Sequence, residues 1–232
     1  MKKKIIALLA VCAAVSQAAT ANEVGFYIGG YVGQARKEVP QTPFHELTDV
    51  IHQITAFTPQ DEQISLDDQD TAFTILGGYR WNRYLAFEAG FSKLGRVTYT
   101  SRATGTYPFD TGFFNTTVES QTSGFTFAAF GTLPLTRDWE LFAGAGALVA
   151  TNRLRLSFRA EGTDFVPAIG NSGSDSFSQS TTDTYASLGV SRRILEIYDL
   201  RLTYLRVFSA GEEVTGGKGD LDAAFLGVTV TF

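Results

Sequence analysis

Apolar and polar residues alternate along much of this chain. In the last eight residues every second position is apolar, and these positions are Leu226, Val228, Val230 and Phe232. A period of two puts successive side chains on opposite faces of a β-strand. The pattern therefore predicts a strand with one apolar face that runs to the last residue of the sequence.

Similar segments, rich in glycine, aromatic residues and threonine, recur along the sequence. A strand is expected in each of eight segments: Phe26–Gln34, Ala72–Arg80, Leu85–Leu94, Phe125–Leu133, Glu140–Ala150, Thr184–Arg193, Leu200–Phe208 and Leu221–Phe232. About 9 to 11 residues is the length that a tilted strand needs to cross a lipid bilayer. The segments therefore have the length and the alternation of membrane-spanning strands.

The connections between these segments alternate between short and long. The short ones are Trp81–Tyr84, Pro134–Trp139 and Ile194–Asp199, and the long polar ones are Ala35–Thr71, Gly95–Gly124, Thr151–Asp183 and Ser209–Asp220. This rhythm is typical of an up-and-down barrel whose long loops gather at one end. We predict an all-β protein, an eight-stranded antiparallel up-and-down transmembrane β-barrel with four long outer loops and short periplasmic turns.

Aromatic residues gather at the short connections. Both tryptophans of the chain, Trp81 and Trp139, lie there, together with Tyr84 and Tyr198. Amphipathic rings collect at membrane–water interfaces, so these four residues are expected to form the periplasmic aromatic girdle. The alternative is a soluble fold that uses the rings to fix its turns.

Four charged residues fall on the faces of the strands that are opposite the apolar side chains. They are Arg80, Glu88, Glu140 and Arg201. A charge facing lipid is costly, so all four are expected to point into the lumen, where opposite charges can pair. An eight-stranded barrel has room inside for little more than side chains. We expect an ion-pair network that fills the lumen, and the alternative is a narrow or gated path for ions.

The beginning of the chain has the pattern of a secretory signal. Three lysines precede a short apolar run, Ile5–Val15, and Ala19–Ala21 has the small residues of a cleavage site. We predict that residues 1–21 are a cleaved signal peptide and that residues 22–232 form a single barrel domain. An acylated Cys12 is the alternative. Cleavage after Ala21 would remove Cys12, the chain's one cysteine, so neither a disulfide nor thiol chemistry is expected.

The charge balance changes the list of expected partners. The chain has 19 basic and 24 acidic residues, and loss of the three lysines near its beginning makes the mature part more acidic still. A negative chain has no electrostatic footprint for nucleic acid, so nucleic acid is not expected as a partner.

The first long connection contains a helical pattern. Between Pro43 and Ala56 we expect a short amphipathic helix, because apolar residues recur there at steps of three and four. They are Phe44, Leu47, Val50, Ile51, Ile54 and Phe57. This face is expected either to pack across the barrel mouth and against other loops, or to contact a partner or a lipid surface.

Candidate chemistry in this connection is weak. His45 and His52, the only histidines, are seven residues apart and share a helical face, but a metal site needs a third ligand that is not evident. The acidic run Asp67–Asp70 is more typical of a solvated loop than of a calcium site. We therefore expect no cofactor, no metal and no catalytic residue.

Two stretches resemble the small outer-membrane barrels of the OmpA/OmpX type, also described as opacity or porin-family barrels. They are LGGYRWNRYLAFEAGFSKLG, from Leu76 to Gly95, and the terminal FLGVTVTF. The resemblance covers Phe26–Phe232. It implies that Leu226, Val228, Val230 and Phe232 form the signal read by the barrel-assembly machinery, although an aromatic residue is commoner at the position of Val230.

The resemblance and the filled lumen together suggest a function. We expect a non-enzymatic barrel of the outer membrane with a structural or envelope role, whose surface loops serve adhesion or partner contact. The expected partners are outer-membrane lipid and lipopolysaccharide, the assembly machinery, and a host or surface ligand. A narrow porin-like channel for small solutes or ions is the alternative, and a lipid A-modifying enzyme is less expected because the His-x-Ser arrangement of the deacylases is absent.

Overall fold

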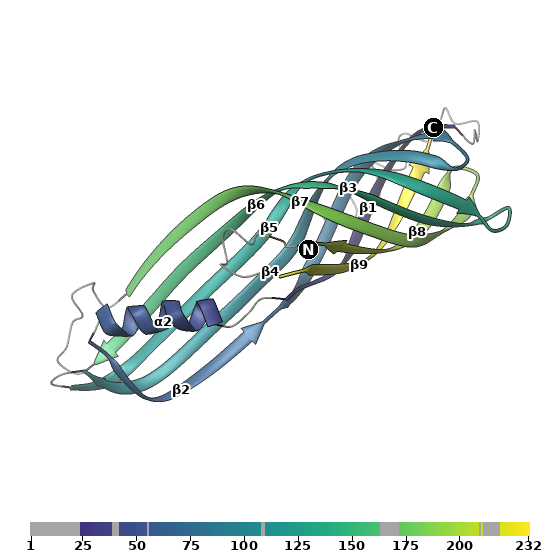
Figure 1. The fold of residues 1–232 in the computed structure, drawn as a ribbon. Helices are drawn as coiled ribbons and strands as arrows, with labels where there is room; N and C mark the ends of the chain where they lie inside the picture. The colour runs from purple at the N-terminus through teal and green to yellow at the C-terminus, as the bar shows by residue number, and fades with distance from the viewer. Residues whose placement is uncertain are drawn as a thin grey trace.

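The chain forms one antiparallel sheet that closes on itself, in a computed structural model that describes residues 24–38, 42–54, 56–107, 110–162, 172–208, 210 and 219–232 (Figure 1). The elements are β1 (Gly25–Lys37), α2 (Thr42–Ile54), β2 (Thr58–Asp67), β3 (Gln69–Asn82), β4 (Leu85–Tyr107), β5 (Asp110–Pro134), β6 (Trp139–Gly162), β7 (Ser172–Leu195), β8 (Tyr198–Val207) and β9 (Leu221–Thr231).

Eight of the described strands make the ring. Going round it, β1 pairs with β3, β3 with β4, and each strand from β4 to β8 pairs with the next. The first and last strands close the ring, with a register that runs from Tyr27 opposite Thr231 to Lys37 opposite Leu221. The predicted eight-stranded antiparallel up-and-down architecture is confirmed, with short turns at one end.

The side chains alternate between the outside and the lumen as the period of two requires. On β1, Phe26, Ile28 and Val32 are exposed on the outer surface, whereas Tyr27 and Tyr31 are buried inside. Outward-facing apolar residues of the ring strands form a surface that we call the apolar belt, which includes Phe26, Ile28, Val32, Phe73, Ile75, Phe87, Phe125, Phe127, Leu141, Val149, Leu188, Leu202, Leu226 and Val228. A surface of this kind is what contact with lipid requires.

Four strands are longer than the sequence analysis predicted. Strands β4 to β7 have between 23 and 25 residues, and they continue well past the ends of β8 and β9 (Figure 1). The expectation that Gly95–Gly124 and Thr151–Asp183 are loops was wrong for most of their length. These stretches alternate Ser and Thr with larger residues, and pairing with a neighbouring strand satisfies their backbone hydrogen bonds beyond the apolar belt.

The first long connection also contains more structure than predicted. Helix α2 lies within two residues of its expected limits, but it is followed by the unpredicted strand β2, which pairs with the outer part of β4. Helix α2 packs on the concave side of the extended strands, where Ile51 and Phe57 join Ala103, Phe114 and Ala160 in one core.

A bulge marks the point where β4 changes its partner. Strand β3 pairs with β4 as far as Lys93, and β2 begins to pair with it at Thr98. Between them Gly95 has a φ of 87°, in the left-handed region that glycine enters without strain. A Cβ at Gly95 would also lie 3.2 Å from the Cβ of Asp70. Glycine therefore allows β4 to bend here and continue outward.

The predicted signal peptide, with Cys12, lies outside the described residues. Within the parts of the chain that the structure describes, α2 is too short to cross a membrane.

Candidate functional site in the barrel lumen

The four charged residues predicted to face inward come from four different strands. Arg80 lies on β3, Glu88 on β4, Glu140 on β6 and Arg201 on β8. Each alternates with outward-facing neighbours, so strand period alone sets its direction. The structure brings the four together as two separate pairs inside the ring.

Arg80 and Glu140 form a bidentate ion pair. Nη1 of Arg80 donates to Oε1 of Glu140 at 2.8 Å, and Nη2 donates to Oε2 at 2.9 Å. The planar guanidinium matches the carboxylate fork, so this geometry is both strong and specific in direction. Because β3 and β6 are not neighbours in the sheet, the pair spans the lumen.

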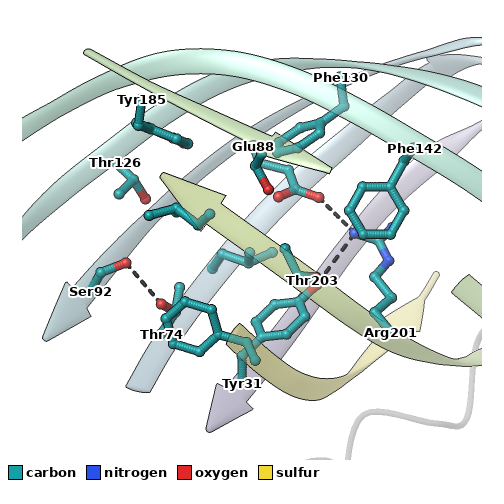
Figure 2. Close-up of a pocket in the computed structure, with 14 residues that line it drawn as sticks. Tyr31, Thr74, Glu88, Ser92, Thr126, Phe130, Phe142, Tyr185, Arg201 and Thr203 are labelled. Atoms are coloured by element: carbon teal, nitrogen blue, oxygen red, sulfur yellow. Dashed lines mark hydrogen bonds and ion pairs between the residues drawn. The ribbon is translucent and has the colours of Figure 1, made fainter. Parts of the chain in front are cut away.

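Glu88 is the acceptor for two donors. Nη1 of Arg201 donates to its Oε1 at 2.7 Å, and the hydroxyl of Tyr27 donates to the same oxygen at 2.6 Å. The Arg201 guanidinium also donates to the Tyr31 hydroxyl at 3.3 Å (Figure 2). The desolvation of both charges is therefore offset by pairing and by tyrosine hydroxyls.

Aromatic rings surround the guanidinium of Arg201. Its Cζ lies 5.0 Å from the ring centroid of Tyr27. It lies 5.2 Å from the ring centroid of Phe142, which Phe130 contacts edge-on (Figure 2). Cation–π contacts of this kind hold a buried cation without adding a counter-charge. The side chain of Arg201 is thus fixed on several sides.

The lack of a side chain at Gly227 leaves room for the ring of Tyr31. A Cβ at Gly227 would come within 2.1 Å of Cδ1 of Tyr31 and within 2.5 Å of the carbonyl oxygen of Gly30. Only a residue without a Cβ fits between them. The Gly227 position therefore lets Tyr31 lie flat against β9 and reach Arg201.

A small cavity remains beside this cluster. Its volume is about 50 Å³, and Glu88, Thr126, Tyr185 and Arg201 are among the side chains around it (Figure 2). A space of this size holds a few water molecules and not a wide column of solvent.

Apolar side chains close the lumen on the far side of the cavity. A fully or almost fully buried core there includes Leu94, Leu148, Val207 and Leu221, with the buried Lys37 opposite Leu221, and Phe225 of the same core lines the cavity itself. Charged side chains and an apolar layer thus follow one another along the barrel axis, and both layers fill its interior.

A chain of polar side chains lies beyond the apolar core. The hydroxyl of Thr122 donates to Asn152 at 2.8 Å, and the Asn152 amide donates to Thr181 at 3.0 Å. The Thr181 hydroxyl donates in turn to Asp183 at 3.0 Å. The buried Thr122 and Asn152 are therefore connected by hydrogen bonds to the half-buried Thr181 and Asp183.

The aromatic part of the cluster was not predicted from the sequence. Tyr27, Tyr31 and Phe142 were not named as site residues, although their strand parity places them on the same face as the charged residues. The sequence feature that could have identified these residues is an aromatic residue at an inward-facing strand position close to an inward-facing charged residue. Which arginine pairs with which glutamate was also not predicted.

The residues of the predicted girdle lie at the short-turn end. Trp81 and Tyr84 are well exposed, Trp139 is exposed beside the guanidinium of Arg192, and Tyr198 is half-buried. The Trp139 ring centroid lies 5.3 Å from Cζ of Arg192. Their contact with a membrane interface stays a prediction.

The residues of the predicted assembly signal do not all share one environment. Leu226 and Val228 are exposed on the outer face of β9, whereas Val230 is buried, with 2% of its surface exposed, and Phe232 is half-buried. The backbone N–H of Phe232 donates to the carbonyl of Phe26 at 2.9 Å. Recognition of these residues by an assembly machinery stays a prediction.

The apolar contact face predicted for the helix in the first long connection is partly buried and partly exposed. Ile51 and Phe57 are buried in a core of the chain itself, whereas Val50 is 48% exposed. The side chains of Phe44, Leu47 and Ile54 lie outside the described residues. At Ile51 and Phe57 the face packs against the extended strands, and Val50 is accessible to a partner.

The two histidines pack among aromatic rings. The ring centroid of His52 lies 5.2 Å from those of Phe57 and Phe114, and the His45 ring lies 6.4 Å from Tyr99. Burial lowers the pKa of His52 below its ordinary value, against the opposing charges of Glu62 and Asp49. This environment favours the neutral imidazole.

The residues that the structure describes contain no cluster of three or more His, Cys, Asp or Glu side chains suited to a metal ion. In the acidic run at the start of β3, Asp68 accepts from Nε of Arg36 at 2.7 Å. Oδ1 of Asp70 accepts the backbone N–H of Thr71 at 2.7 Å. Asp68 and Asp70 thus take part in local contacts within the barrel.

Comparison with known proteins gives one family and several structures. The family described as "Outer membrane protein beta-barrel domain" matches residues 5–232. No curated protein matches the chain. Among solved structures, Neisserial surface protein A is 15% identical over 90% of this chain and 97% of its own, with a TM-score of 0.46.

Two further solved structures have similar coverage. The outer membrane protein OprG from Pseudomonas aeruginosa is 11% identical over 91% of this chain and 97% of its own, with a TM-score of 0.42. The attachment invasion locus protein Ail of Yersinia pestis is 13% identical over 90% of this chain and 99% of its own, with a TM-score of 0.38.

Proposed function

The chain belongs to the outer membrane protein beta-barrel domain family, and from this premise we propose that it is a non-enzymatic outer-membrane barrel with a closed lumen. The barrel has a structural or envelope role, its short turns face the periplasm, and its long-loop end is a contact surface for adhesion or a partner. One observation carries the proposal: the packed lumen keeps a cavity of only about 50 Å³ beside the Arg201–Glu88 pair.

A liposome-swelling assay with the chain from Asn22 to Phe232 tests the closed lumen. Liposomes that carry the folded protein are expected to take up small sugars no faster than empty liposomes, while a general porin serves as the positive control. Sugar-dependent swelling above the empty-liposome rate would overturn the closed lumen.

A narrow channel is the second candidate, and the polar lining of the cavity favours it. Thr74, Ser92 and Thr126 offer hydroxyls beside Glu88, and the Thr74 and Ser92 hydroxyls lie 2.8 Å apart. A conducting path for ions would have to pass the apolar layer that contains Leu148 and Leu221. That layer is the reason for placing the closed barrel first.

Packing of the two histidines supports a role without catalysis. His52 lies in the aromatic contacts between α2 and β5, away from the carboxylates of the lumen. The test is the acyl pattern of lipid A, measured by mass spectrometry in cells with and without the gene. An unchanged pattern is expected, and a changed acyl pattern that the intact gene restores would support a lipid-modifying enzyme instead.

The contact role rests on exposed apolar side chains beyond the apolar belt. Val50 on α2 and Phe177 on β7 are both exposed, on parts of the chain that stand outside the expected bilayer. Adherence of bacteria to an epithelial monolayer tests this role. Val50→Ser with Phe177→Ser is expected to lower adherence, and unchanged adherence of both this variant and a gene deletion would exclude it.

A further inference from the structure

Two arginines stand on the outer face of β6 just beyond the apolar belt. The outward-facing apolar residues of this strand run from Leu141 to Val149, and the next outward positions are Thr151, Arg153 and Arg155. Both arginine side chains are exposed. The strand therefore passes directly from an apolar surface to a cationic one.

The spacing along β6 places the backbone of these arginines just outside the lipid headgroup layer. Arg153 follows Val149 by four residues, or about 13 Å of strand, which is about 10 Å along the membrane normal at the tilt of such barrels. Headgroup regions extend about 5 to 8 Å beyond the hydrocarbon on each side of a bilayer. Arg153 therefore lies about 2 to 5 Å beyond this layer and Arg155 about 7 to 10 Å beyond it, and their long, flexible side chains can reach back toward the headgroups.

Other arginines at the same end of the barrel have acidic partners. Arg36 pairs with Asp68 at 2.7 Å, Arg206 pairs with Asp220, and Arg96 pairs with Glu119 at 3.2 Å. These exposed pairs neutralise much of the charge around the rim. Among the described residues Arg153 and Arg155 on β6 lack such a partner, as does the exposed Arg102 on β4, and Arg153 and Arg155 lie two residues apart on one face of the same strand.

Arg153 and Arg155 form no ion pair with any residue that the structure describes. Their cross-strand neighbours on β7 are Ser178 and Ser176. On β5, Arg153 lies opposite Gln121, and Arg155 lies opposite Glu119, the residue already bound to Arg96. The surface thus keeps an excess of positive charge on a chain whose formal net charge is −5.

The surface beside these arginines is hollowed. A hollow of about 400 Å³ is lined by Arg153, Arg155 and the residues Ser174–Ser178 of β7. The lining holds two guanidinium groups and three serine hydroxyls against one carboxylate, that of Asp175. Guanidinium and hydroxyl groups together are the donors that a phosphate needs for its several acceptor oxygens.

We propose that Arg153 and Arg155 bind the phosphorylated headgroup of a glycolipid in the outer leaflet of the outer membrane. Two residues apart on one face, the arginines are about 7 Å from each other, so both flexible side chains reach one phosphate. The acyl chains of the same lipid then lie against Val149 and Phe125, which face each other across β5 and β6 on the apolar belt. The inference goes beyond the closed barrel, because a conducting lumen would leave it unchanged.

Binding of bisphosphorylated lipid A to the chain from Asn22 to Phe232 tests this inference. The protein is folded in detergent micelles, and the apparent dissociation constant is measured by native mass spectrometry. The test variant is Arg153→Gln with Arg155→Gln. The matched control is Arg137→Gln with Arg192→Gln, which removes the same charge at the short-turn end.

The test variant is expected to bind bisphosphorylated lipid A at least about tenfold more weakly, since charge-assisted hydrogen bonds to phosphate are lost. The control variant stays within about twofold of wild type, and raising the salt concentration weakens wild type more than the test variant. Phosphate-free lipid A binds wild type and the test variant equally. A heat-modifiable gel band confirms that each variant is folded, and Arg155→Gln alone replaces the double variant if that one does not fold.

Three results would overturn the inference. One is equal binding of bisphosphorylated lipid A by wild type and the test variant. Another is wild-type binding of phosphate-free lipid A that is as tight as that of the bisphosphorylated form. The third is complete displacement of lipid A by an equal concentration of inositol hexaphosphate, which would identify a site for soluble polyanions and not for a membrane lipid.

Discussion

Arg201 on β8 and Glu88 on β4 meet in the middle of the barrel, with 2.7 Å between Nη1 and Oε1. In the ring of eight paired strands, β4 and β8 are separated by three strands in either direction, so they lie opposite each other. The ion pair is therefore a cross-brace of the barrel and not a contact between neighbours. The pair between Arg80 and Glu140 crosses the lumen in a similar way.

Removal of one partner of this cross-brace is expected to destabilise the barrel. Glu88→Ala leaves the Arg201 guanidinium buried without its carboxylate, and breaking a buried pair costs about 3 to 5 kcal/mol. The free energy of unfolding, measured by urea titration in lipid vesicles, is expected to fall by this amount, and no large conductance is expected to appear.

A double-mutant cycle separates the pair from the individual side chains. Glu88→Ala with Arg201→Ala is expected to be less destabilised than the sum of the two single variants, because neither charge is then left alone. Additive effects of the two substitutions would show that the ion pair contributes nothing of its own.

The close packing of Tyr31 on Gly227 gives a second prediction. A Cβ on Gly227 meets both the ring and a backbone carbonyl, so Gly227→Ala is expected to lower the free energy of unfolding by about 1 to 3 kcal/mol. Gly30→Ala is the matched control on the adjacent strand, since a Cβ there has no neighbour within 4 Å. Equal effects of the two substitutions in a urea titration would contradict this explanation.

Docking of α2 is expected to depend on pH through His52. Burial lowers the pKa of His52 in the docked helix, so the undocked helix binds a proton more readily. Docking is therefore at full strength above about pH 6.5, the ordinary pKa of histidine, and weakens as the pH falls from there toward the lowered pKa.

Hydrogen exchange of the α2 amides between pH 5 and 8 measures this dependence. After correction for the intrinsic effect of pH on exchange, protection of the helix is expected to fall on the acidic side. His52→Phe keeps an aromatic ring and is expected to remove the dependence. A wild-type helix whose corrected protection is constant over this range would exclude His52 as its cause.

The strand period was enough to place the charged residues of the lumen, but not to pair them. Alternation gave the direction of Arg80, Glu88, Glu140 and Arg201, because a one-residue shift would put them in lipid. The partner of each residue depends on the tilt and stagger of strands across the ring, and these cannot be predicted from the sequence of a single strand. Strand parity also placed Tyr27 inward, but its hydrogen bond to Glu88 depends on β1 and β4 in three dimensions.

The length of the outer strands could not be predicted from composition. Segments such as Ser172–Asp183 are rich in Ser and Thr, a composition that predicts a loop, and the structure pairs them with β6. The periodicity of α2 was clear because its apolar residues recur over several turns. Strand β2 follows closely and has acidic residues at Asp61 and Glu62, which are more typical of a polar loop than of a strand.

The two tryptophans provide a direct probe of the girdle. Trp81 and Trp139 are the only tryptophans of the chain and lie at the same end of the barrel. Brominated lipids are expected to quench their fluorescence most strongly when the bromines lie high on the acyl chains, near the headgroups. Trp81→Phe and Trp139→Phe each report on the remaining ring, and stronger quenching by bromines at the bilayer centre would contradict the interfacial position.

Single-channel conductance of the refolded chain from Asn22 to Phe232 in a planar bilayer tests the claim that the lumen is closed. A heat-modifiable gel band first shows that the protein is folded. The packed cavity beside Arg201 and Glu88 predicts a flat current with no steady open state. A reproducible conductance step whose ion selectivity changes in Glu88→Gln would contradict the claim and show that the charged residues line a path.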